Sequence, residues 1–243
     1  TCTGTYTNGD YVVNCHDGVA HGELDIYGIL GMSCNGAFDT IAQTLNSTKW
    51  QKLAEDFGYN QSDRSQVDFP YKKSHFDIAS DDSVWSRMQL AIGQGTTTVT
   101  PLLNLMMYAA IANDGVMMTP YLVDHYLDAD GNVVEQTKPK ALRSVCTKAE
   151  AELMDEFLTY VITSGRRAGR SPAAAGGSQY ARVSGKTGSA QYDSTKNYHA
   201  WFCGYGTNDV SEIAVCVMIE KGGAGGIVAA PVAGQIFDYY FSR

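Results

Sequence analysis

The sequence predicts a single α+β domain in which an antiparallel sheet packs against helices. Helical patterns dominate residues 21–165, three strand-like segments follow within residues 182–220, and an apolar helix closes the chain. Helices first and strands afterwards is an order typical of α+β domains. The length of 243 residues allows one sizeable core, and the chain shows neither an internal repeat nor an interdomain linker.

Composition and charge exclude several other classes of protein. Hydrophobic residues make up 44% of the chain and charged residues 18%, as in globular rather than disordered proteins. The net charge of -8 argues against a surface for nucleic acid or anionic membranes. No apolar run approaches the roughly 18 residues of a membrane span, and no signal peptide opens the chain. Because there is no initiator Met and the first residues are strand-like, we expect a part of a longer protein.

The first element is a predicted hairpin. Asn8-Gly9 lies between two strand-like runs, a strong signal for a two-residue turn. If these two residues form the loop, Cys2 faces Cys15 at a non-hydrogen-bonded pair, where Cα atoms lie about 4.5 Å apart. That spacing suits a disulfide, and the alternative is two reduced thiols packed side by side. None of the six cysteines forms a Cys-x-x-Cys pair, so we expect no structural zinc site.

The next elements are helices. A short helical run over residues 21–30 precedes a second helix that includes Ala37 and Leu45, and residues 46–80 are polar enough to predict a surface excursion. Thr100 and Pro101 form a strong helix start, as N-cap and first helical residue. This helix is apolar on all faces, which predicts burial all round, and Asp114-Gly115 ends it.

The second half begins with a hairpin turn at Asp130-Gly131 and a helix that starts at a Thr147/Glu150 capping box and stops at Gly165. A mobile loop over 165–182 should follow. The predicted strands are 182–192, 199–206 and 212–220, and a final helix from Pro231 should bury Val232, Ile236 and Tyr239. We therefore expect one domain over 1–243, with a hairpin in 1–20, a mainly helical part in 21–165, and sheet strands with the closing helix in 182–243.

The most specific chemical signal is Lys186-Thr187-Gly188, followed by Ser189, on the first predicted strand. A substrate that ends in a carboxylate needs a fixed cation and hydroxyl donors, and a glycine lets it lie close to a strand edge. Lys-Thr-Gly is one of three motifs of serine acyl-transferases that bind penicillin. A phosphate-binding loop is excluded, because that pattern requires glycine where this chain has Tyr180.

A second signal, Ser33-Cys34-Asn35, matches a Ser-x-Asn motif 153 residues before Lys186. Alone it could be an ordinary helix cap. With the other segments, in this order, the chain resembles the class B penicillin-binding proteins over nearly its whole length. The segments that carry the resemblance are His21-Gly22, Met32 to Asn35, Ala91 to Gly95, Thr119 to Leu122, Gly185 to Gln191, Ala200 to Tyr205 and Ala230 to Val232.

The resemblance implies a serine β-lactamase/penicillin-binding transpeptidase-like fold and a D,D-transpeptidase on the outer face of the bacterial cell membrane. Such an enzyme cross-links peptidoglycan stem peptides ending in D-Ala-D-Ala through an acyl-serine, is acylated by β-lactams, and uses no cofactor or metal. By similarity, Ser33 would relay a proton toward the leaving amine and Asn35 would hold the substrate amide. Lys186 would hold the proton network together, Thr187 and Ser189 would bind the terminal carboxylate, and the Ser189 N–H would be one oxyanion donor.

The chain departs from the family in one motif. The nucleophile belongs to Ser-x-x-Lys, and no Ser in this sequence has Lys three positions later. We therefore expect the motif upstream, with two strands and the central helix of the fold, and a membrane anchor further upstream. The chain alone should be inactive and should not persist as a free monomer. A missing N-terminal segment of the same protein, or a self-associating copy, should complete it.

Two alternatives remain at this point. A D,D-carboxypeptidase or a β-lactamase shares Lys-Thr-Gly but deacylates with water. A non-catalytic β-lactam sensor or cell-wall scaffold would share the fold without the turnover. The five histidines show no ligand spacing and are assigned structural roles, and Cys203 and Cys216 are expected to be buried thiols rather than a pair.

Overall fold

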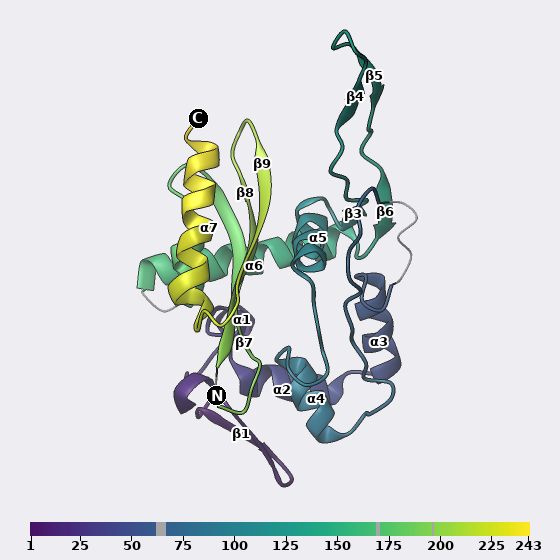
Figure 1. Cartoon of the computed structure of the whole chain (residues 1–243). Coiled ribbons are helices and arrows are strands. Elements are labelled where there is room, and N and C mark those ends of the chain that lie inside the picture. The colour runs from purple at the N-terminus through teal and green to yellow at the C-terminus, as the bar shows by residue number, and fades with distance from the viewer. Residues whose placement is uncertain (62–66, 169–170, 196) are drawn as a thin grey trace.

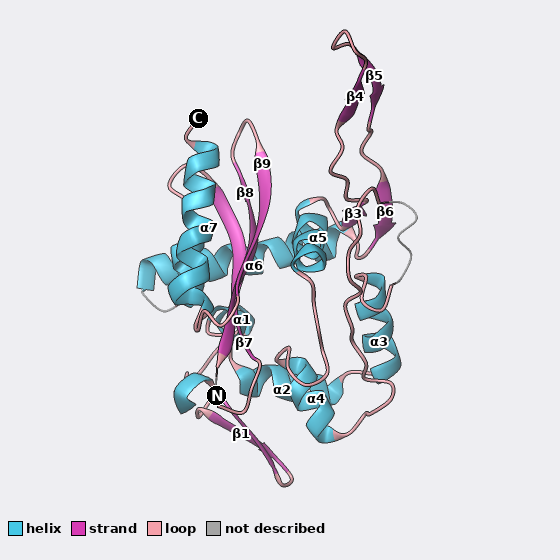
Figure 2. Ribbon diagram, in the orientation of Figure 1, coloured by secondary structure: helices cyan, strands magenta, loops and turns pink. Residues whose placement is uncertain are grey.

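The computed structural model describes residues 1–61, 67–168, 171–195 and 197–243 of the protein, and the expected α+β class is confirmed (Figures 1 and 2). In chain order the elements are β1 (Thr5–Asn8), β2 (Tyr11–Asn14), a 3₁₀ helix (His16–Gly18), α1 (Ile26–Gly31), α2 (Asn35–Thr44), α3 (Ser47–Asp56), α4 (Val84–Ala91), α5 (Pro101–Ala112), β3 (Val116–Met118), β4 (His125–Leu127), β5 (Val133–Gln136), β6 (Ala141–Ser144), α6 (Lys148–Ala168), a second 3₁₀ helix (Pro172–Gly176), β7 (Arg182–Gln191), β8 (Tyr198–Thr207), β9 (Glu212–Ile219) and α7 (Gly225–Phe241).

An antiparallel sheet of β7, β8 and β9 forms the centre of the C-terminal half. All three strands were predicted, with ends that differ by one residue or less from the expected ranges. Figure 1 shows α7 along one face of this sheet and α6 crossing behind it, while the β4–β5 hairpin projects from the far end of the molecule. Within the described residues β8 is the middle strand, so β7 presents an outer edge.

The main core lies between this sheet, α6 and α7. Its fully buried side chains include Phe202 of β8 and Phe237 of α7, whose rings meet edge to face with centroids 6.4 Å apart. Gly185 is required here, because a Cβ atom would lie 2.7 Å from the Phe202 ring and 2.9 Å from the Cys203 carbonyl oxygen. The close packing of β7 against β8 therefore depends on a glycine at position 185, immediately before Lys186.

The closing helix differs from its prediction in start and in buried face. It begins at Gly225 rather than Pro231, because Gly225 and Gly226 allow its first turn to contact Gly188 and Pro172 directly. Val232, Ile236 and Tyr239, expected in the core, are 40%, 39% and 61% exposed. The buried face consists instead of small residues and two phenylalanines: Ala229, Ala230, Ala233, Gly234, Phe237 and Phe241.

The N-terminal hairpin forms, but its predicted register is wrong. Asn8 pairs with Tyr11, so Gly9-Asp10 is the turn, and Cys2 pairs with Gly22 instead of Cys15. An Asn-Gly turn of the expected type needs φ > 0 at both residues, whereas only Gly9 has it here. Of the two possibilities left open for Cys2 and Cys15, the structure shows the second: both are free thiols, with their Sγ atoms side by side at 3.6 Å and no disulfide between them.

Residues 46–80 are more ordered than predicted, apart from 62–66, which lie outside the described residues. Asn46 caps α3 by accepting a hydrogen bond from the Lys49 backbone, and Phe76 and Ile78 are buried beside Trp50 of that helix. The helix α4 was not predicted. Its Arg87 reaches the carbonyl oxygens of Ala42 and Leu45 and thereby ties α4 to the end of α2.

The two helix starts with the clearest caps are confirmed. Thr100 accepts a hydrogen bond from the Leu103 N–H at the start of α5, and Thr147 and Glu150 form the capping box of α6. Within the described chain α5 is mostly part-exposed rather than buried all round. The helix α6 continues past Gly165 to Ala168, and the expected 165–182 loop contains a 3₁₀ helix, while 169–170 lie outside the described residues. The Asp130-Gly131 turn joins β4 and β5 as predicted.

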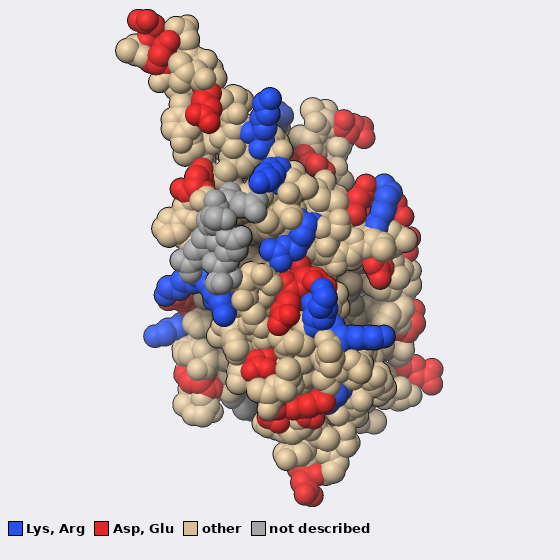
Figure 3. Space-filling model, turned by 90° about the vertical axis from the view of Figure 1, so that its right-hand side faces the viewer, with Lys and Arg blue, Asp and Glu red and all other residues tan. Residues whose placement is uncertain are grey.

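Charged side chains of both signs lie interspersed on the face shown in Figure 3. Among the described residues, no helix combines the length and apolar character needed to cross a membrane. Cys203 and Cys216 face each other in register across β8 and β9 with Sγ atoms 2.8 Å apart. Both are free thiols, but only Cys203 is buried as expected, whereas Cys216 is half-buried.

Asp39 of α2 yields a prediction about stability and pH. Its side chain is fully buried, neither carboxylate oxygen has a hydrogen-bond partner among the described residues, and burial raises its pKa from 3.8 to about 7. The folded state then binds more protons than the unfolded state between about pH 4 and pH 7, so stability falls as pH rises through that window. We expect Asp39→Asn to remove this slope and to stabilise the protein at pH 8 by a few kcal/mol, about 1.4 kcal/mol per pKa unit.

Denaturant unfolding across the pH range measures this effect. Asp209→Asn, on the exposed β8–β9 turn, is the control and should leave the slope in place. An unchanged slope in Asp39→Asn would contradict the assignment.

Candidate active site

The two predicted motifs meet in space. The Lys186 Nζ atom on β7 donates hydrogen bonds to the Ser33 Oγ atom at 2.5 Å and to the Thr187 carbonyl oxygen at 3.0 Å. Ser33 and Lys186 are 153 residues apart in sequence. Their contact joins the helical part to the sheet and defines the centre of the candidate site.

Ser33 lies in the turn between α1 and α2 with a φ of 51°. Positive φ is uncommon for a residue with a side chain and costs of order 1 kcal/mol or more. The turn is held by backbone hydrogen bonds from Ser33 to the Leu30 carbonyl and from Cys34 to the Ile29 carbonyl, and Cys34 is only 1% exposed. The buried neighbour therefore helps to keep Ser33 aimed at Lys186.

Asn35 is the first residue of α2, and the N-terminal hairpin orients its side chain. Its Nδ2 atom donates a 2.8 Å hydrogen bond to the Asn14 carbonyl oxygen at the end of β2. The amide oxygen keeps its acceptor capacity for a ligand. The structure thus brings Ser33 and Lys186 into direct contact and places Asn35 two residues from Ser33.

The outer edge of β7 carries the remaining predicted residues. Tyr192 donates its backbone N–H to the Asn197 carbonyl across the β7–β8 turn. Backbone groups alternate in direction along an antiparallel strand, so those of Thr187, Ser189 and Gln191 point away from β8. The Ser189 Oγ atom accepts a 3.0 Å hydrogen bond from Gly225 N at the start of α7.

Gln94 is a site residue whose role the sequence did not reveal. With its amide in the hydrogen-bonding orientation, the nitrogen donates to the Gln191 carbonyl oxygen and the oxygen accepts from the Gln191 N–H, both at 3.2 Å. Gly93 and Gly95 on either side both have positive φ, which lets the loop turn sharply around it. Gln94 therefore ends the open stretch of the β7 edge.

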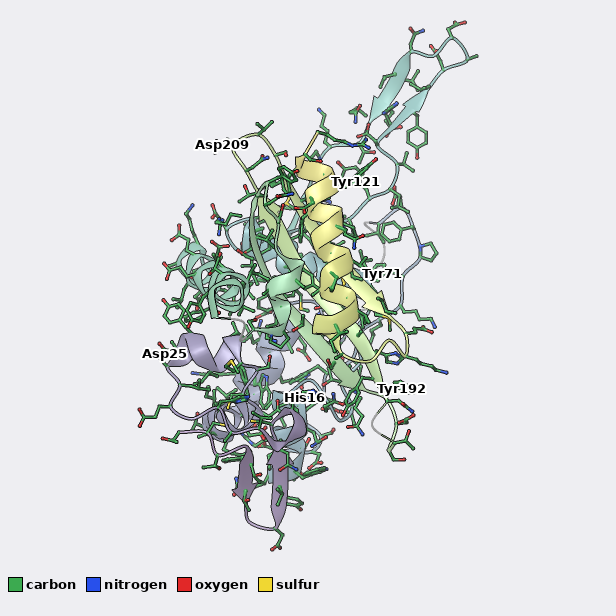
Figure 4. All side chains as sticks on the ribbon, turned by 90° about the vertical axis from the view of Figure 1, so that its left-hand side faces the viewer. His16, Asp25, Tyr71, Tyr121, Tyr192 and Asp209 are labelled. Atoms are coloured by element: carbon green, nitrogen blue, oxygen red, sulfur yellow. The ribbon has the colours of Figure 1, made fainter. Side chains whose placement is uncertain are left out.

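A cleft of about 460 Å³ adjoins this edge, lined by residues of β2, α4, the Gln94 loop and the end of β7. Its lining includes Val12, Asn14, Gln94, Gln191 and Tyr192. Figure 4 shows Tyr192 at the end of the sheet near the N-terminal segment and Asp209 at the opposite end. The cleft thus lies at the end of the sheet that meets the hairpin, beside the backbone that holds Asn35.

The electrostatics of Lys186 differ from those of a surface lysine. Burial lowers the pKa of its ammonium from 10.5 to about 8, although part of the side chain remains exposed. Desolvation disfavours the charged form of an amine. Lys186 is therefore still mostly charged at neutral pH, yet close enough to titration to take part in proton transfer.

Comparison with known proteins identifies the class that this fold and site define. The family described as "Penicillin binding protein transpeptidase domain" matches residues 1–238. The chain belongs to this family, and its relatives place it in class B, as the motifs predicted.

The relatives themselves carry informative names. The chain is 27% identical to the peptidoglycan D,D-transpeptidase PbpA of Mycolicibacterium smegmatis, over 82% of this chain and 40% of that protein. It is 28% identical to the peptidoglycan D,D-transpeptidase MrdA of Acinetobacter baumannii, over 90% of this chain and 35% of that protein. It therefore spans about two fifths or less of these relatives.

Solved structures confirm the fold. The D,D-transpeptidase domain of a peptidoglycan glycosyltransferase from Eggerthella lenta matches 98% of this chain and 58% of that chain, with a TM-score of 0.84 and 25% identity. An imipenem acyl-enzyme complex of penicillin-binding protein A from M. tuberculosis matches all of this chain and 55% of that chain, with a TM-score of 0.85 and 22% identity.

Proposed function

We propose that this chain provides the carboxylate-binding wall and the proton relay of a D,D-transpeptidase that cross-links peptidoglycan stem peptides. The observation that carries the proposal is the 2.5 Å hydrogen bond between Lys186 Nζ and Ser33 Oγ, beside a strand edge with outward backbone groups. It places the Lys186 cation and the Ser33 hydroxyl close to the outward-pointing Ser189 N–H, and acyl transfer to and from a serine requires such groups together.

In the proposed reaction a serine hydroxyl adds to the carbonyl carbon of the D-Ala-D-Ala peptide bond. The C–N bond breaks, the serine proton passes to the departing D-Ala nitrogen, and an ester remains. An amine of a second stem peptide then adds to the ester and restores the serine hydroxyl. Ser33 hands the proton to the leaving nitrogen and Lys186 holds Ser33 in place, while the outward Ser189 N–H stabilises the oxyanion.

The β7 edge suits a ligand that ends in a carboxylate. Ser189 Oγ accepts from Gly225 N, so its own hydroxyl hydrogen is free to donate, and Thr187 adds a second hydroxyl. Gly188 is not required by the fold, since a Cβ atom there would meet only Trp201 at an ordinary 3.4 Å. We therefore assign its lack of a side chain to the clearance that a bound substrate or β-lactam needs, with Asn35 holding the ligand amide.

The nucleophile is not among residues 1–243, because no Ser in them has Lys three positions later. We propose that a Ser-x-x-Lys segment, from the same protein or from a self-associating copy, completes the site. Residues 1–243 then act as one domain on the outer face of the cell membrane, where peptidoglycan is assembled. Names of relatives and β-lactam complexes of similar folds support this assignment.

Intact-mass analysis with a fluorescent penicillin tests the proposal. We expect one label per molecule in the whole protein, on a serine outside residues 1–243, and none on the chain by itself. Labelling at Ser33, or no labelling of the whole protein, would contradict it. Transfer of the acyl group to an added amine rather than to water would separate a transpeptidase from a carboxypeptidase or β-lactamase.

A further inference from the structure

Two cysteines face each other across the central sheet, in the same row as Lys186. Cys203 of β8 pairs with Lys186 of β7 on one side and with Cys216 of β9 on the other. Directly paired residues of an antiparallel sheet point their side chains to the same face. The Cys203 and Cys216 Sγ atoms lie 2.8 Å apart, whereas those of Cys2 and Cys15 lie 3.6 Å apart. The contact across β8 and β9 is therefore closer than one between thiols that only pack side by side.

The register of the two strands places this pair where a disulfide fits. At the end of the β8–β9 hairpin the Asn208 N–H donates to the Ser211 carbonyl oxygen at 3.1 Å. Hydrogen-bonded and non-hydrogen-bonded pairs alternate along an antiparallel ladder, and pairing continues without a shift from Thr207 to Cys203. Cys203 and Cys216 are therefore a non-hydrogen-bonded pair. The Cα atoms of such pairs lie about 4.5 Å apart, inside the disulfide range of roughly 4.4–6.8 Å.

We propose that Cys203 and Cys216 are a site of oxidation and form a disulfide bond that joins β8 to β9 beside Lys186. Disulfides persist outside the cytoplasm. That environment rests on the proposed function, whereas the register of the two cysteines does not. Among the described residues no third metal-binding side chain converges on the pair, so oxidation to a disulfide is the chemistry that these two thiols support.

The two thiols have different parts in forming the bond. The Cys203 Sγ atom donates a hydrogen bond to the Cys216 Sγ atom, which lowers the pKa of Cys216. Cys216 is half-buried, while Cys203 is only 3% exposed. Because thiol reactivity follows thiolate character and access, the Cys216 thiolate is the attacking group and Cys203 completes the bond.

The oxidant is a protein disulfide, of the kind carried by thiol oxidoreductases. The Cys216 thiolate attacks one of its sulfurs, the S–S bond of the oxidant breaks, and a mixed disulfide forms. Cys203 gives its proton to the thiolate released from the oxidant and then attacks Cys216 Sγ. The Cys203–Cys216 bond forms as the mixed disulfide breaks. The oxidant leaves with two electrons and, after taking up a proton equivalent to the one that Cys216 released, as a dithiol.

The bond stabilises the sheet at the row that carries Lys186. A disulfide restricts the unfolded chain, and the loop closed here is the β8–β9 hairpin. Lys186 and Cys203 are direct partners, so separation of β8 from β9 would loosen the strand against which Lys186 is held. We therefore expect the oxidised whole protein to keep its reactivity toward a fluorescent penicillin at temperatures where the reduced protein has lost it.

Peptide mapping of the whole protein tests the bond. The protein is exported to an oxidising compartment, then denatured and alkylated before any reduction. We expect the peptides that contain Cys203 and Cys216 to be linked, and Cys146 to be alkylated. In Cys216→Ser, Cys203 should become open to alkylation. Free thiols at both positions in the wild type, or a link from either to another cysteine, would overturn the proposal.

Thermal unfolding of the whole protein gives a second readout. Reductant should lower the midpoint of the wild type by roughly 5–10 °C. It should lower the midpoint of Cys146→Ser equally and leave Cys216→Ser unshifted. If Cys216→Ser fails to fold, Cys203→Ala combined with Cys216→Val, which places apolar groups in the same space, gives the same comparison. A wild-type midpoint that reductant does not change would overturn the stabilising role. A linked pair in a protein that no penicillin labels would contradict the proposed function and support the bond.

Discussion

Lys186→Met is expected to slow acylation of the whole protein by penicillin by about 10²–10⁴-fold, the range typical for a positioned proton-transfer group. Methionine has a similar length but cannot donate a hydrogen bond to Ser33 Oγ and carries no charge. The variant therefore loses both the contact that holds the proton relay and the positive charge beside the β7 edge. The charged form of Lys186 is the one that makes these contacts. The wild-type rate should therefore fall as pH rises through about 8, the pKa of Lys186, and this titration should vanish in the variant.

Stopped-flow acylation kinetics measure this effect. Lys49→Met, on the exposed surface of α3, is a matched control and should behave as wild type. Lys186→Arg should not restore the rate, because a planar guanidinium does not replace a compact ammonium at a buried contact. A loss of less than about tenfold in Lys186→Met would contradict the role assigned to it.

Phe237→Ala is expected to lower the free energy of unfolding by about 3–5 kcal/mol. Phe237 is fully buried and packs against Phe202 of β8, with Phe241 on its other side at a centroid distance of 6.5 Å. The remaining cavity would lie between α7 and the middle strand, where neighbouring backbone cannot easily collapse. A loss of this size is a large share of a typical stability of about 5–15 kcal/mol.

Ile236→Ala is the control for this prediction and compares the two possible faces of α7. The sequence pattern assigned Ile236 to the core, but it is 39% exposed. Its truncation should cost about 1 kcal/mol or less, as for most surface positions. Urea unfolding of the whole protein measures both variants, and a larger cost at Ile236 than at Phe237 would mean that α7 packs by its other face.

Elements with local signals were predicted well. The Thr100 cap, the capping box of α6 and the Asp130-Gly131 turn depend on interactions between residues close in sequence. The β7–β9 strands were recognised from residue types that favour extended backbone. Part of the candidate site was predictable as well, because Lys-Thr-Gly and Ser-x-Asn are short motifs. Their contact could be expected only from the family resemblance, since nothing within either motif points to the other.

The errors concern choices between locally equivalent arrangements. Asn8-Gly9 and Gly9-Asp10 are both acceptable two-residue turns when judged by residue type alone. In the structure Gly9-Asp10 forms the turn, and Cys2 pairs with Gly22 rather than with Cys15. The buried face of α7 was misassigned because hydrophobic size favours Val232 and Ile236. Close contact with Ala175 instead requires the small Gly234, where a Cβ atom would lie 2.5 Å from the Ala175 carbonyl oxygen.

Sequence patterns were enough to predict the fold class, the family, the principal strands and helix caps, and the residue types available for chemistry. The hairpin register, the packing face of α7, the Ser33–Lys186 contact and the convergence of Cys2, Cys15, His21 and Cys34 became visible only in the three-dimensional structure. The physical reason is that caps, turns and strand patterns arise from neighbouring residues. Distances between residues far apart in sequence depend on how whole elements pack, which no local pattern specifies.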